Sequence, residues 1–498
     1  MNRAAAWLSC ATVISMGAVA AAAQPTAAVK VSVDWKNVAQ TLRTTPTLQV
    51  VVNPPLRRGS SIHDEAFATL KGLGADYVRY VPWLPYPRLA VAELEPPTKE
   101  KTSWDFSLID PMTIDFLKAT EGHSTILNFS TSPAWMWESK KQAVLPKDPN
   151  QVVWDYTQGT QLRDPSRKEL ADYYTRLIEW YTKGGFTDEL GMRHESGHHF
   201  NLPYWEVFNE VDSEHEQTPE EYTKNYDAIV GALHAVDPQM KFVGLALAFP
   251  ERNPAMFEYF LNHANHKPGI PLDMISYHFY ATPTREQTVN DWQYSFFDQA
   301  ERFIVATRFI ESIRKRLSPE TRTDMDEIGS ILPTDGDANA KPSIPPLYWH
   351  VSGALYAYLF VESAKMGIDV VGESQLVGYP TQYPSVSLVD WTTGKPNARL
   401  EVLRLIHESV HVGDAMAETT FPSAELDAQA FRDATSERLL LINKRNRDIT
   451  VTLPEEFAKG QVTTVDLSTD GTRSTAKSWS GQTMTLAPFA VATVTAAR

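Results

Sequence analysis

Cysteine is almost absent from this chain of 498 residues, whose single cysteine is Cys10. Cys10 lies in an N-terminal segment that we expect to be removed, so the mature chain would form no disulfide. Small secreted domains depend on disulfides because they bury little apolar surface. The roughly 475 residues that remain are enough to bury a core that is stable without them.

An excess of positive charge is also missing. The chain has 46 Lys and Arg against 61 Asp and Glu, a formal net charge of −15. Nucleic acids and anionic membrane surfaces are bound by clusters of Lys and Arg, and the sequence has no such block. These two partners are therefore not expected. The 43% of hydrophobic and 21% of charged residues are typical of a globular protein.

Long hydrophobic runs are confined to the N-terminus. Arg3 precedes an apolar run from Ala4 to Ala22, which ends in small residues suited to cleavage after Ala23. We therefore expect residues 1–23 to be a signal peptide and the mature protein to be secreted or periplasmic, without a membrane association. A membrane anchor is the alternative, but the run is rich in alanine and only weakly apolar.

Short apolar runs alternate with longer segments of helical period through most of the chain. This alternation predicts parallel strands joined by crossover helices. A doubly wound sheet is the alternative, but no glycine-rich phosphate turn follows any of the strands. We predict an α/β fold, a (β/α)8 TIM barrel over residues 42–410. The eight predicted strands are Leu48–Val52, Tyr77–Val81, Thr125–Phe129, Tyr204–Phe208, Phe242–Ala246, Met274–His278, Met325–Ile328 and Val370–Glu373.

Two helix starts are indicated by capping boxes. Thr218 and Glu221 flank Pro219 before one apolar stripe, and Ser166 and Glu169 precede another. In such a box the hydroxyl accepts a hydrogen bond from the backbone N–H three residues later. We expect one helix to begin at each box.

The residue pattern of the sequence changes near residue 415, where short alternating runs are separated by polar or glycine-containing turns. This pattern predicts a C-terminal antiparallel β-sandwich over residues 411–498. Residues 24–41 contain an alternating run, Val29–Trp35, and are expected to join the sandwich. The predicted sandwich strands are Arg438–Ile442, Ile449–Leu453, Val462–Asp466, Thr483–Leu486 and Phe489–Val494.

Carboxylates stand at the ends of two predicted barrel strands. Asn209 and Glu210 follow the fourth strand, and Glu327 lies on the seventh. In a TIM barrel the reactive groups lie at the C-terminal ends of the strands, so these side chains should face each other across the mouth. Two opposed carboxylates are what glycoside hydrolysis requires.

The run Tyr204–Glu210 resembles the fourth-strand motif of the clan A retaining glycoside hydrolases. It continues Val211-Asp212, where the clan usually has Pro-Asn. Within the clan, Ile275–Tyr280 and Pro384–Pro396 resemble glycoside hydrolase family 39, which includes β-xylosidases and α-L-iduronidases. The resemblance extends over nearly the whole mature chain, including the barrel-plus-sandwich arrangement.

The resemblance implies roles for six residues. Glu210 matches the general acid/base and Glu327 the nucleophile. The neighbouring Asp326 remains an alternative nucleophile, although alternation on a strand should point it away from Glu327. The implied substrate-binding residues are Asn209 for the sugar 2-hydroxyl, Arg79 in support of the nucleophile, and His278 and Tyr280 in the pocket.

Aromatic residues are abundant, with 13 Trp, 19 Tyr and 21 Phe. Trp83 and Trp135 lie near strand ends and are expected to line a sugar pocket, although core packing is the commoner use of such rings.

A rival motif is His194-Glu195-Ser196-Gly197-His198, which fits the H-E-x-x-H pattern of zinc proteases. That pattern works on a helix, where the two histidines share one face. Here glycines and polar residues predict a solvated loop. A loosely held metal on His194, His198 and His199 remains open.

These features predict a secreted retaining exo-glycosidase acting on an oligosaccharide or glycoside, for which the resemblance suggests a β-xylosidase-like activity. A carbohydrate-binding pseudoenzyme is the alternative. No cofactor or metal is implied, because two carboxylates and water suffice. A retaining mechanism requires carboxyl groups about 5–5.5 Å apart, and an inverting one about 6.5–9.5 Å.

Overall fold

The computed structural model describes residues 27–139, 144–156, 159–336, 343–469 and 471–498. The predicted signal peptide, residues 1–23, lies outside the described residues. Within them, no helix is both long enough and apolar enough to cross a membrane.

Eight parallel strands close into a barrel, in which the eighth strand pairs with the first. Each of the eight predicted runs forms one of these strands, so the TIM barrel is confirmed and the doubly wound sheet is wrong. The strands are β3 (Thr45–Val51), β4 (Val78–Val81), β5 (Thr125–Leu127), β8 (Tyr204–Glu206), β9 (Lys241–Leu247), β10 (Met274–Ala281), β11 (Arg322–Ser330) and β12 (Val370–Glu373).

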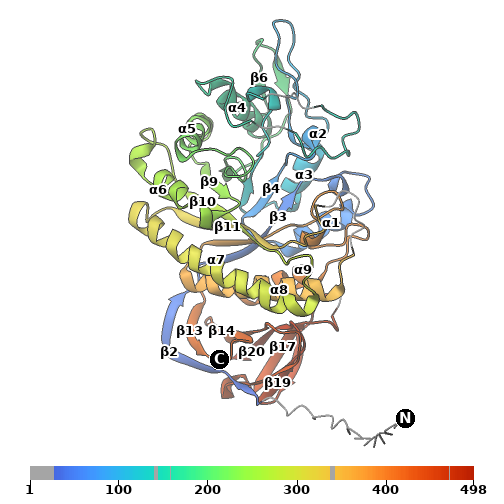
Figure 1. Cartoon of the computed structure of the whole chain (residues 1–498), viewed down its shortest axis with the longest axis vertical. Helices are drawn as coiled ribbons and strands as arrows, with labels where there is room; N and C mark the ends of the chain where they lie inside the picture. Colours follow the sequence, from blue (N-terminus) through green and yellow to red (C-terminus); the bar gives the residue numbers. More distant parts are fainter. Residues whose placement is uncertain (1–26, 140–143, 157–158, 337–342, 470) are drawn as a thin grey trace, which may run out of the picture.

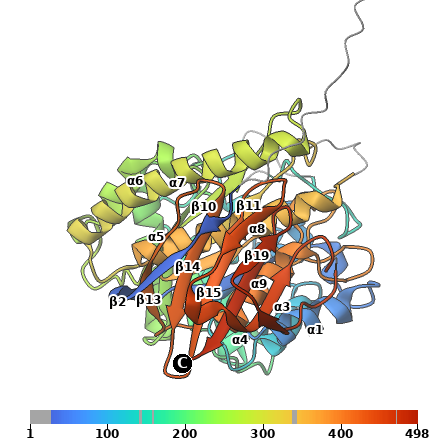
Figure 2. The same cartoon turned by 90° about the horizontal axis from the view of Figure 1, so that it is seen from below.

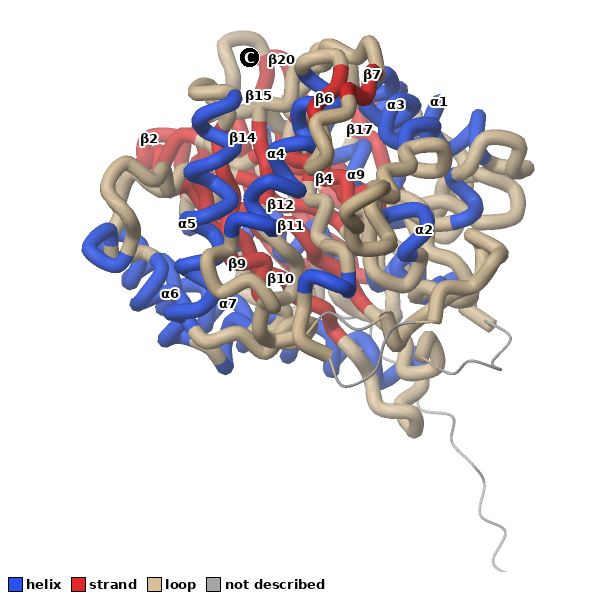
Figure 3. The backbone as a smooth tube through the Cα atoms, turned by 90° about the horizontal axis from the view of Figure 1, so that it is seen from above, coloured by secondary structure: helices blue, strands red, loops and turns tan. Residues whose placement is uncertain are grey.

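Helices flank the barrel strands, as Figure 3 shows from above. They are α1 (His63–Leu73), α2 (Pro87–Ala90), α3 (Asp110–Ala119), α4 (Lys168–Thr182), α5 (Pro219–Val236), α6 (Pro254–Phe260), α7 (Val289–Leu317), α8 (Pro346–Met366) and α9 (Ala398–Ser409). A short hairpin, β6 (Gly185–Thr187) and β7 (Arg193–Glu195), lies between α4 and β8.

The two predicted capping boxes have different outcomes. Thr218 accepts a hydrogen bond from the Glu221 N–H at 3.2 Å and caps α5 as expected. The box before α4 is wrong, because the Asp164 carboxylate accepts the Glu169 N–H, at 3.0 Å. Asp164 precedes the turn at Arg167, whose φ of 65° lies in the left-handed region.

Two further sheets form the C-terminal sandwich. The larger sheet has the order β18-β17-β20-β15-β14-β13-β2 and the smaller one β1-β16-β19. N-terminal residues enter both sheets, because β1 pairs with β16 and β2 with β13. The five predicted strands are present. The strands are β1 (Val29–Lys30), β2 (Ser32–Thr41), β13 (Ala415–Thr420), β14 (Leu426–Arg432), β15 (Ser436–Asn443), β16 (Ile449–Thr452), β17 (Lys459–Val465), β18 (Lys477–Ser480), β19 (Thr483–Leu486) and β20 (Val491–Ala497).

The sandwich packs against the barrel beneath α8 and α9 (Figure 1), and Figure 2 shows its strands lying across these helices. Phe431, Leu440 and Ile442 of the larger sheet are fully buried and belong to the same apolar cluster as the barrel core. Between the two sheets lies a second core, which includes Val31, Leu439 and Val451. One face of the larger sheet is therefore covered by barrel helices and the other by the smaller sheet.

Candidate active site

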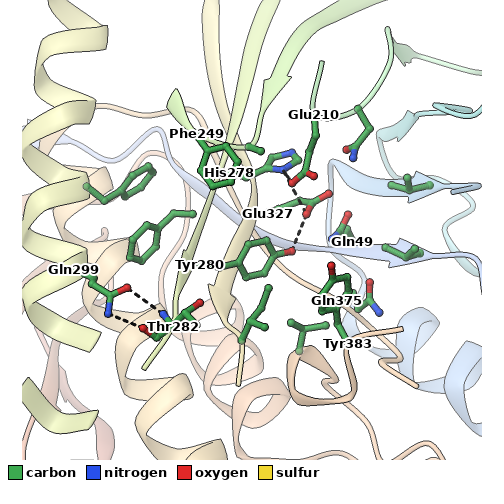
Figure 4. Close-up of a pocket in the computed structure, with 18 of the residues that line it drawn as sticks. Gln49, Glu210, Phe249, His278, Tyr280, Thr282, Gln299, Glu327, Gln375 and Tyr383 are labelled. Carbon is green, nitrogen blue, oxygen red and sulfur yellow. Dashed lines mark hydrogen bonds and ion pairs between the residues drawn. The ribbon is translucent and has the colours of Figure 1, made fainter. Parts of the chain in front are cut away.

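Glu210 and Glu327 meet at the mouth of the barrel with His278 between them (Figure 4). One carboxylate oxygen of each glutamate and one imidazole nitrogen all lie within 4.8 Å of one another. The Nδ1 atom of His278 lies 3.0 Å from Glu210 Oε1 and 3.5 Å from Glu327 Oε2. The two carboxylates predicted from strands four and seven are thus brought together.

Unusual backbone conformations direct Glu210. The fourth strand, β8, ends at Glu206, and beyond it Phe208 and Glu210 have φ of 63° and 41°. The Glu210 N–H donates to the Ala246 carbonyl at 2.8 Å, which ties the turn to the next strand. Non-glycine residues in the left-handed region persist only where the surroundings hold them, and they are frequent at functional sites.

A β-bulge on β11 brings two adjacent acidic side chains inward. Ser276 of β10 pairs with Asp324 of β11, and His278 pairs with Glu327. Two residue steps on β10 therefore oppose three on β11, which has one extra residue. A bulge of this kind interrupts the alternation of side chains. The expectation that Asp326 points away from Glu327 is therefore wrong. Asp326 is buried beneath the cavity, whereas Glu327 lines it.

Arg79, on β4, lies under Glu327 and Asn209 and is only 1% exposed. Its guanidinium contacts Glu327 Oε1 at 2.5 Å and Asp326 Oδ2 at 2.9 Å, and it donates to Asn209 Oδ1 at 2.7 Å. Burial alone would lower the pKa of Arg79, but the charges of Asp326, Glu206 and Glu327 hold it well above its ordinary value. Arg79 does not line the cavity. It positions Asn209 and Glu327, and the contact with Glu327 is the one expected of an arginine that supports this residue.

The sixth strand, β10, contributes His278 and Tyr280. Tyr280 Oη donates to Glu327 Oε2 at 2.7 Å, so each carboxylate oxygen of Glu327 accepts a hydrogen bond. Burial opposes the charge of His278, but the charges of Glu327 and Asp326 raise its pKa well above the ordinary value. Burial also raises the pKa of Tyr280 strongly, which keeps the phenol a donor. These contacts fix the orientation of Glu327.

Glu214 is a site residue that the sequence did not indicate. Its Oε1 atom accepts hydrogen bonds from Trp83 Nε1 at 2.7 Å and from Asn209 Nδ2 at 2.8 Å. Burial, together with the charge of Glu210, raises the pKa of Glu214 to about 8. Near pH 7 this carboxyl group is therefore mostly neutral. It lies in an irregular loop after the fourth-strand motif, where no periodic pattern distinguishes it.

A cavity of about 670 Å³ opens above these residues. Six of the predicted site residues line it, among them Trp83, whose ring stacks on Tyr383 with centroids 6.1 Å apart. Trp135 does not line the cavity: its Nε1 donates to the Glu93 carbonyl at 2.9 Å, and the Arg163 guanidinium lies 4.3 Å from its ring centroid. Residues that line the cavity include Trp83, Asn209, Glu210, Phe249, Arg252, His278, Phe279, Tyr280, Phe303, Glu327, Gln375 and Tyr383.

The H-E-x-x-H motif does not form a zinc-protease site. His194 lies on strand β7 and its Nε2 is 2.9 Å from Asp188 Oδ2, whereas the Nε2 of His198 is 3.2 Å from Asp110 Oδ2. The two histidines therefore share no helical face and have separate carboxylate partners. Among the described residues, the group with the geometry of a metal site is formed by Glu210, His278 and Glu327.

Solved structures with a similar architecture are glycoside hydrolases. They include a GH30 endoxylanase from Clostridium papyrosolvens (15% identity, TM-score 0.57, 94% of this chain and 100% of that one). A GH51 arabinofuranosidase from Xanthomonas axonopodis pv. citri is similar at 11% identity and TM-score 0.63 (95% and 100%). A glucosidase from Croceicoccus marinus is similar at 14% identity and TM-score 0.59 (95% and 99%). The fold is the one these hydrolases share.

Sequence comparisons reach only part of the chain. Residues 423–494 match the family model of the D-apionate lactonase C-terminal immunoglobulin-like domain. No curated protein matches the chain. The matched residues lie within the sandwich and contain none of the residues of the barrel cavity.

Proposed function

We propose that this protein is a retaining glycosidase in which Glu210 is the general acid/base and Glu327 the nucleophile. The observation that carries the proposal is the approach of their carboxylate oxygens to within 4.8 Å across the cavity. Direct attack by a carboxylate requires a separation of about 5–5.5 Å, whereas a water-mediated inverting reaction requires about 6.5–9.5 Å.

The reaction follows from these positions. A carboxylate oxygen of Glu327 attacks the anomeric carbon while the bond to the leaving oxygen breaks and Glu210 donates its proton to that oxygen. Water then attacks the anomeric carbon while the bond from that carbon to Glu327 breaks and frees the carboxylate, and Glu210 takes the proton from the water. Asn209 Nδ2 retains a second N–H for a sugar hydroxyl, because one of its two hydrogens is directed to Glu214.

The finer parts of the proposal rest on the sequence motifs. Membership of glycoside hydrolase family 39, a β-xylosidase-like exo activity and a secreted or periplasmic location are supported by the motifs around Glu210 and Tyr280 and by the N-terminal apolar run. The structural neighbours are an endoxylanase, an arabinofuranosidase and a glucosidase, and these activities favour a neutral sugar as the substrate.

A lactonase is the second candidate, because the sandwich matches the C-terminal domain model of D-apionate lactonase. Hydrolysis of a sugar lactone needs a base to activate water against an acyl carbon. Glu210 could supply that base without any attack by Glu327.

A turnover screen separates these functions. The chain from Gln24 is assayed at pH 5–7 with aryl xylosides, arabinosides, galactosides, glucosides and iduronides, and with a panel of aldonolactones. The glycosidase is supported if Glu327→Ala loses turnover of aryl glycosides and if Glu210→Ala loses turnover of substrates with poor leaving groups. Lactone turnover that survives Glu327→Ala indicates the lactonase. Sugar binding without either turnover indicates the pseudoenzyme.

A further inference from the structure

We propose that Phe249 forms the subsite for the leaving group, as a platform for a ring that has an apolar face. Sugars and phenols share this chemistry. The inference rests on the proposed function, because it takes Glu210 as the acid that protonates the leaving oxygen. It adds a residue and a ligand class that the comparisons and motifs do not assign.

The position of Phe249 relative to the catalytic pair supports this role. Figure 4 places Phe249 beside Glu210 and His278, whereas Gln375 and Tyr383 lie beyond Tyr280. A leaving oxygen must lie within hydrogen-bond reach of Glu210, so the ring attached to it extends past Glu210. The part of the cavity lined by Phe249 is where that ring arrives.

The Phe249 ring is unusually accessible for an apolar side chain at a cavity wall, with 40% of its surface exposed. The Arg252 guanidinium lies 4.4 Å from the ring centroid and covers part of the ring. Phe279 and Phe303, stacked with centroids 4.6 Å apart, line the same cavity and add two further aromatic rings to its wall. A ring placed against Phe249 would remove apolar surface from water, which is favourable.

Asp212 connects the loop of Phe249 to the turn that carries Glu210. Its carboxylate accepts hydrogen bonds from the backbone N–H groups of Ala248 and Phe249, at 2.9 and 3.0 Å, and from Asn253 Nδ2 at 2.8 Å. Asp212 stands two residues after Glu210 in the chain. The loop that carries Phe249 is therefore held in a fixed position relative to Glu210 before any ligand binds. Less conformational entropy is then lost on binding.

The test uses thioglycosides, which bind without being cleaved. Calorimetry compares phenyl and methyl 1-thioglycosides and a thio-linked disaccharide of the glycone that the turnover screen selects, or of xylose if it selects none. The phenyl and disaccharide ligands should bind the wild type more tightly than the methyl ligand. Phe249→Ala should reduce this preference about tenfold, the effect expected for one lost ring contact. Phe249→Tyr should keep it.

Phe309→Ala is the matched control, because Phe309 is 56% exposed on α7 and does not line the cavity. A preference for the phenyl ligand alone identifies a phenol site, and one for the disaccharide alone identifies a sugar site. The proposal would be overturned if Phe249→Ala weakened the binding of the methyl and ring-bearing ligands equally. It would also be overturned if the wild type bound the ring-bearing ligands no more tightly than the methyl ligand. Ring preference in a wild type that has no turnover would refute the proposed function, and Phe249 would then be a ring-binding site but not a leaving-group subsite.

Discussion

Glu214 shows how a single carboxyl group can organise a site without touching the reacting atoms. It accepts hydrogen bonds from Trp83 and Asn209, and its pKa of about 8 makes it an uncharged acceptor at the pH of the proposed reaction. We expect Glu214→Gln to keep both hydrogen bonds and to change kcat/KM less than about threefold, since the replaced group is already neutral at pH 6.

Glu214→Leu should lower kcat/KM about ten- to hundredfold at pH 6, because it removes an acceptor from two donors at the cavity. Steady-state kinetics on the best aryl glycoside check both variants, and circular dichroism checks that they fold. A glutamine variant as inactive as the leucine variant would show that the role of Glu214 depends on its acid proton or charge.

The sequence predicted the residues that lie on strands more securely than those in loops. Glu210, Glu327 and Tyr280 follow from strand ends and family motifs, and the structure brings them together. Trp135 was misplaced because a tryptophan near a strand end can turn either way, and here it packs on Arg163. Glu214 acts through hydrogen bonds from Asn209 and from Trp83, and Trp83 is 131 residues away in the chain, so no local pattern reveals this role.

At the scale of elements, the bulge on β11 decides which carboxylate reaches the cavity. Gly372 of β12 lies against it, and a Cβ atom there would meet the Asp326 carbonyl oxygen at 2.9 Å. We expect Gly372→Ala to shift the bulge, to displace Glu327 and to lower kcat at least tenfold. The activity should fall because reacting groups must stay within fractions of an ångström of their positions.

The matched control is Gly231→Ala within α5, where a Cβ atom would meet only Ile270 Cδ1, at 3.4 Å. Alanine in a helix interior stabilises by about 0.5–1 kcal/mol relative to glycine, so this variant should keep its activity and melt at the same or a higher temperature. Full activity in Gly372→Ala, measured at the same temperature, would show that the bulge does not control Glu327.

Strand positions were predictable because barrel strands are buried on both faces and most of these runs are rich in apolar residues, but strand irregularities were not. The bulge depends on the register between β10 and β11, which the sequence of either strand does not contain. Three sandwich strands, β13, β14 and β18, were missed. The runs Ala415–Thr420 and Leu426–Arg432 contain several alanines and few β-branched residues, and Lys477–Ser480 is short and mostly polar.

At the scale of the whole molecule, the sandwich supports the barrel. Phe431 and Leu440 are fully buried in the cluster that contains the barrel core, so removing the sandwich would expose the apolar surfaces of α8 and α9. Truncation after Gly413 should give an insoluble or unstable barrel, which solubility and thermal melting would show. A soluble, active truncated chain, with polysaccharide retained by the isolated sandwich, would instead make the sandwich a binding module.

Buried carboxyl groups predict how stability depends on pH. Both side-chain oxygens of Glu93 are buried without a hydrogen-bond partner, and burial raises its pKa from 4.5 to about 8. Between these values the folded chain keeps a proton that the unfolded chain has released, so this group lowers stability as pH rises from about 5 to 8.

Glu93→Gln should therefore flatten the decline of the melting temperature over this range, because the amide does not titrate. The exposed Glu100→Gln should leave the decline unchanged and serves as the control. Melting curves at five pH values would decide, and an unchanged slope in Glu93→Gln would contradict the account of Glu93.

Capture of the glycosyl-enzyme tests directly whether Glu327 is the nucleophile of a retaining reaction. The wild type is incubated with a 2-deoxy-2-fluoro glycoside of the sugar it hydrolyses, and the modified peptide is located by mass spectrometry. We expect one added glycosyl unit on Glu327, formed over the same time in which activity is lost. A label on Asp326, or loss of activity with no covalent adduct, would contradict it.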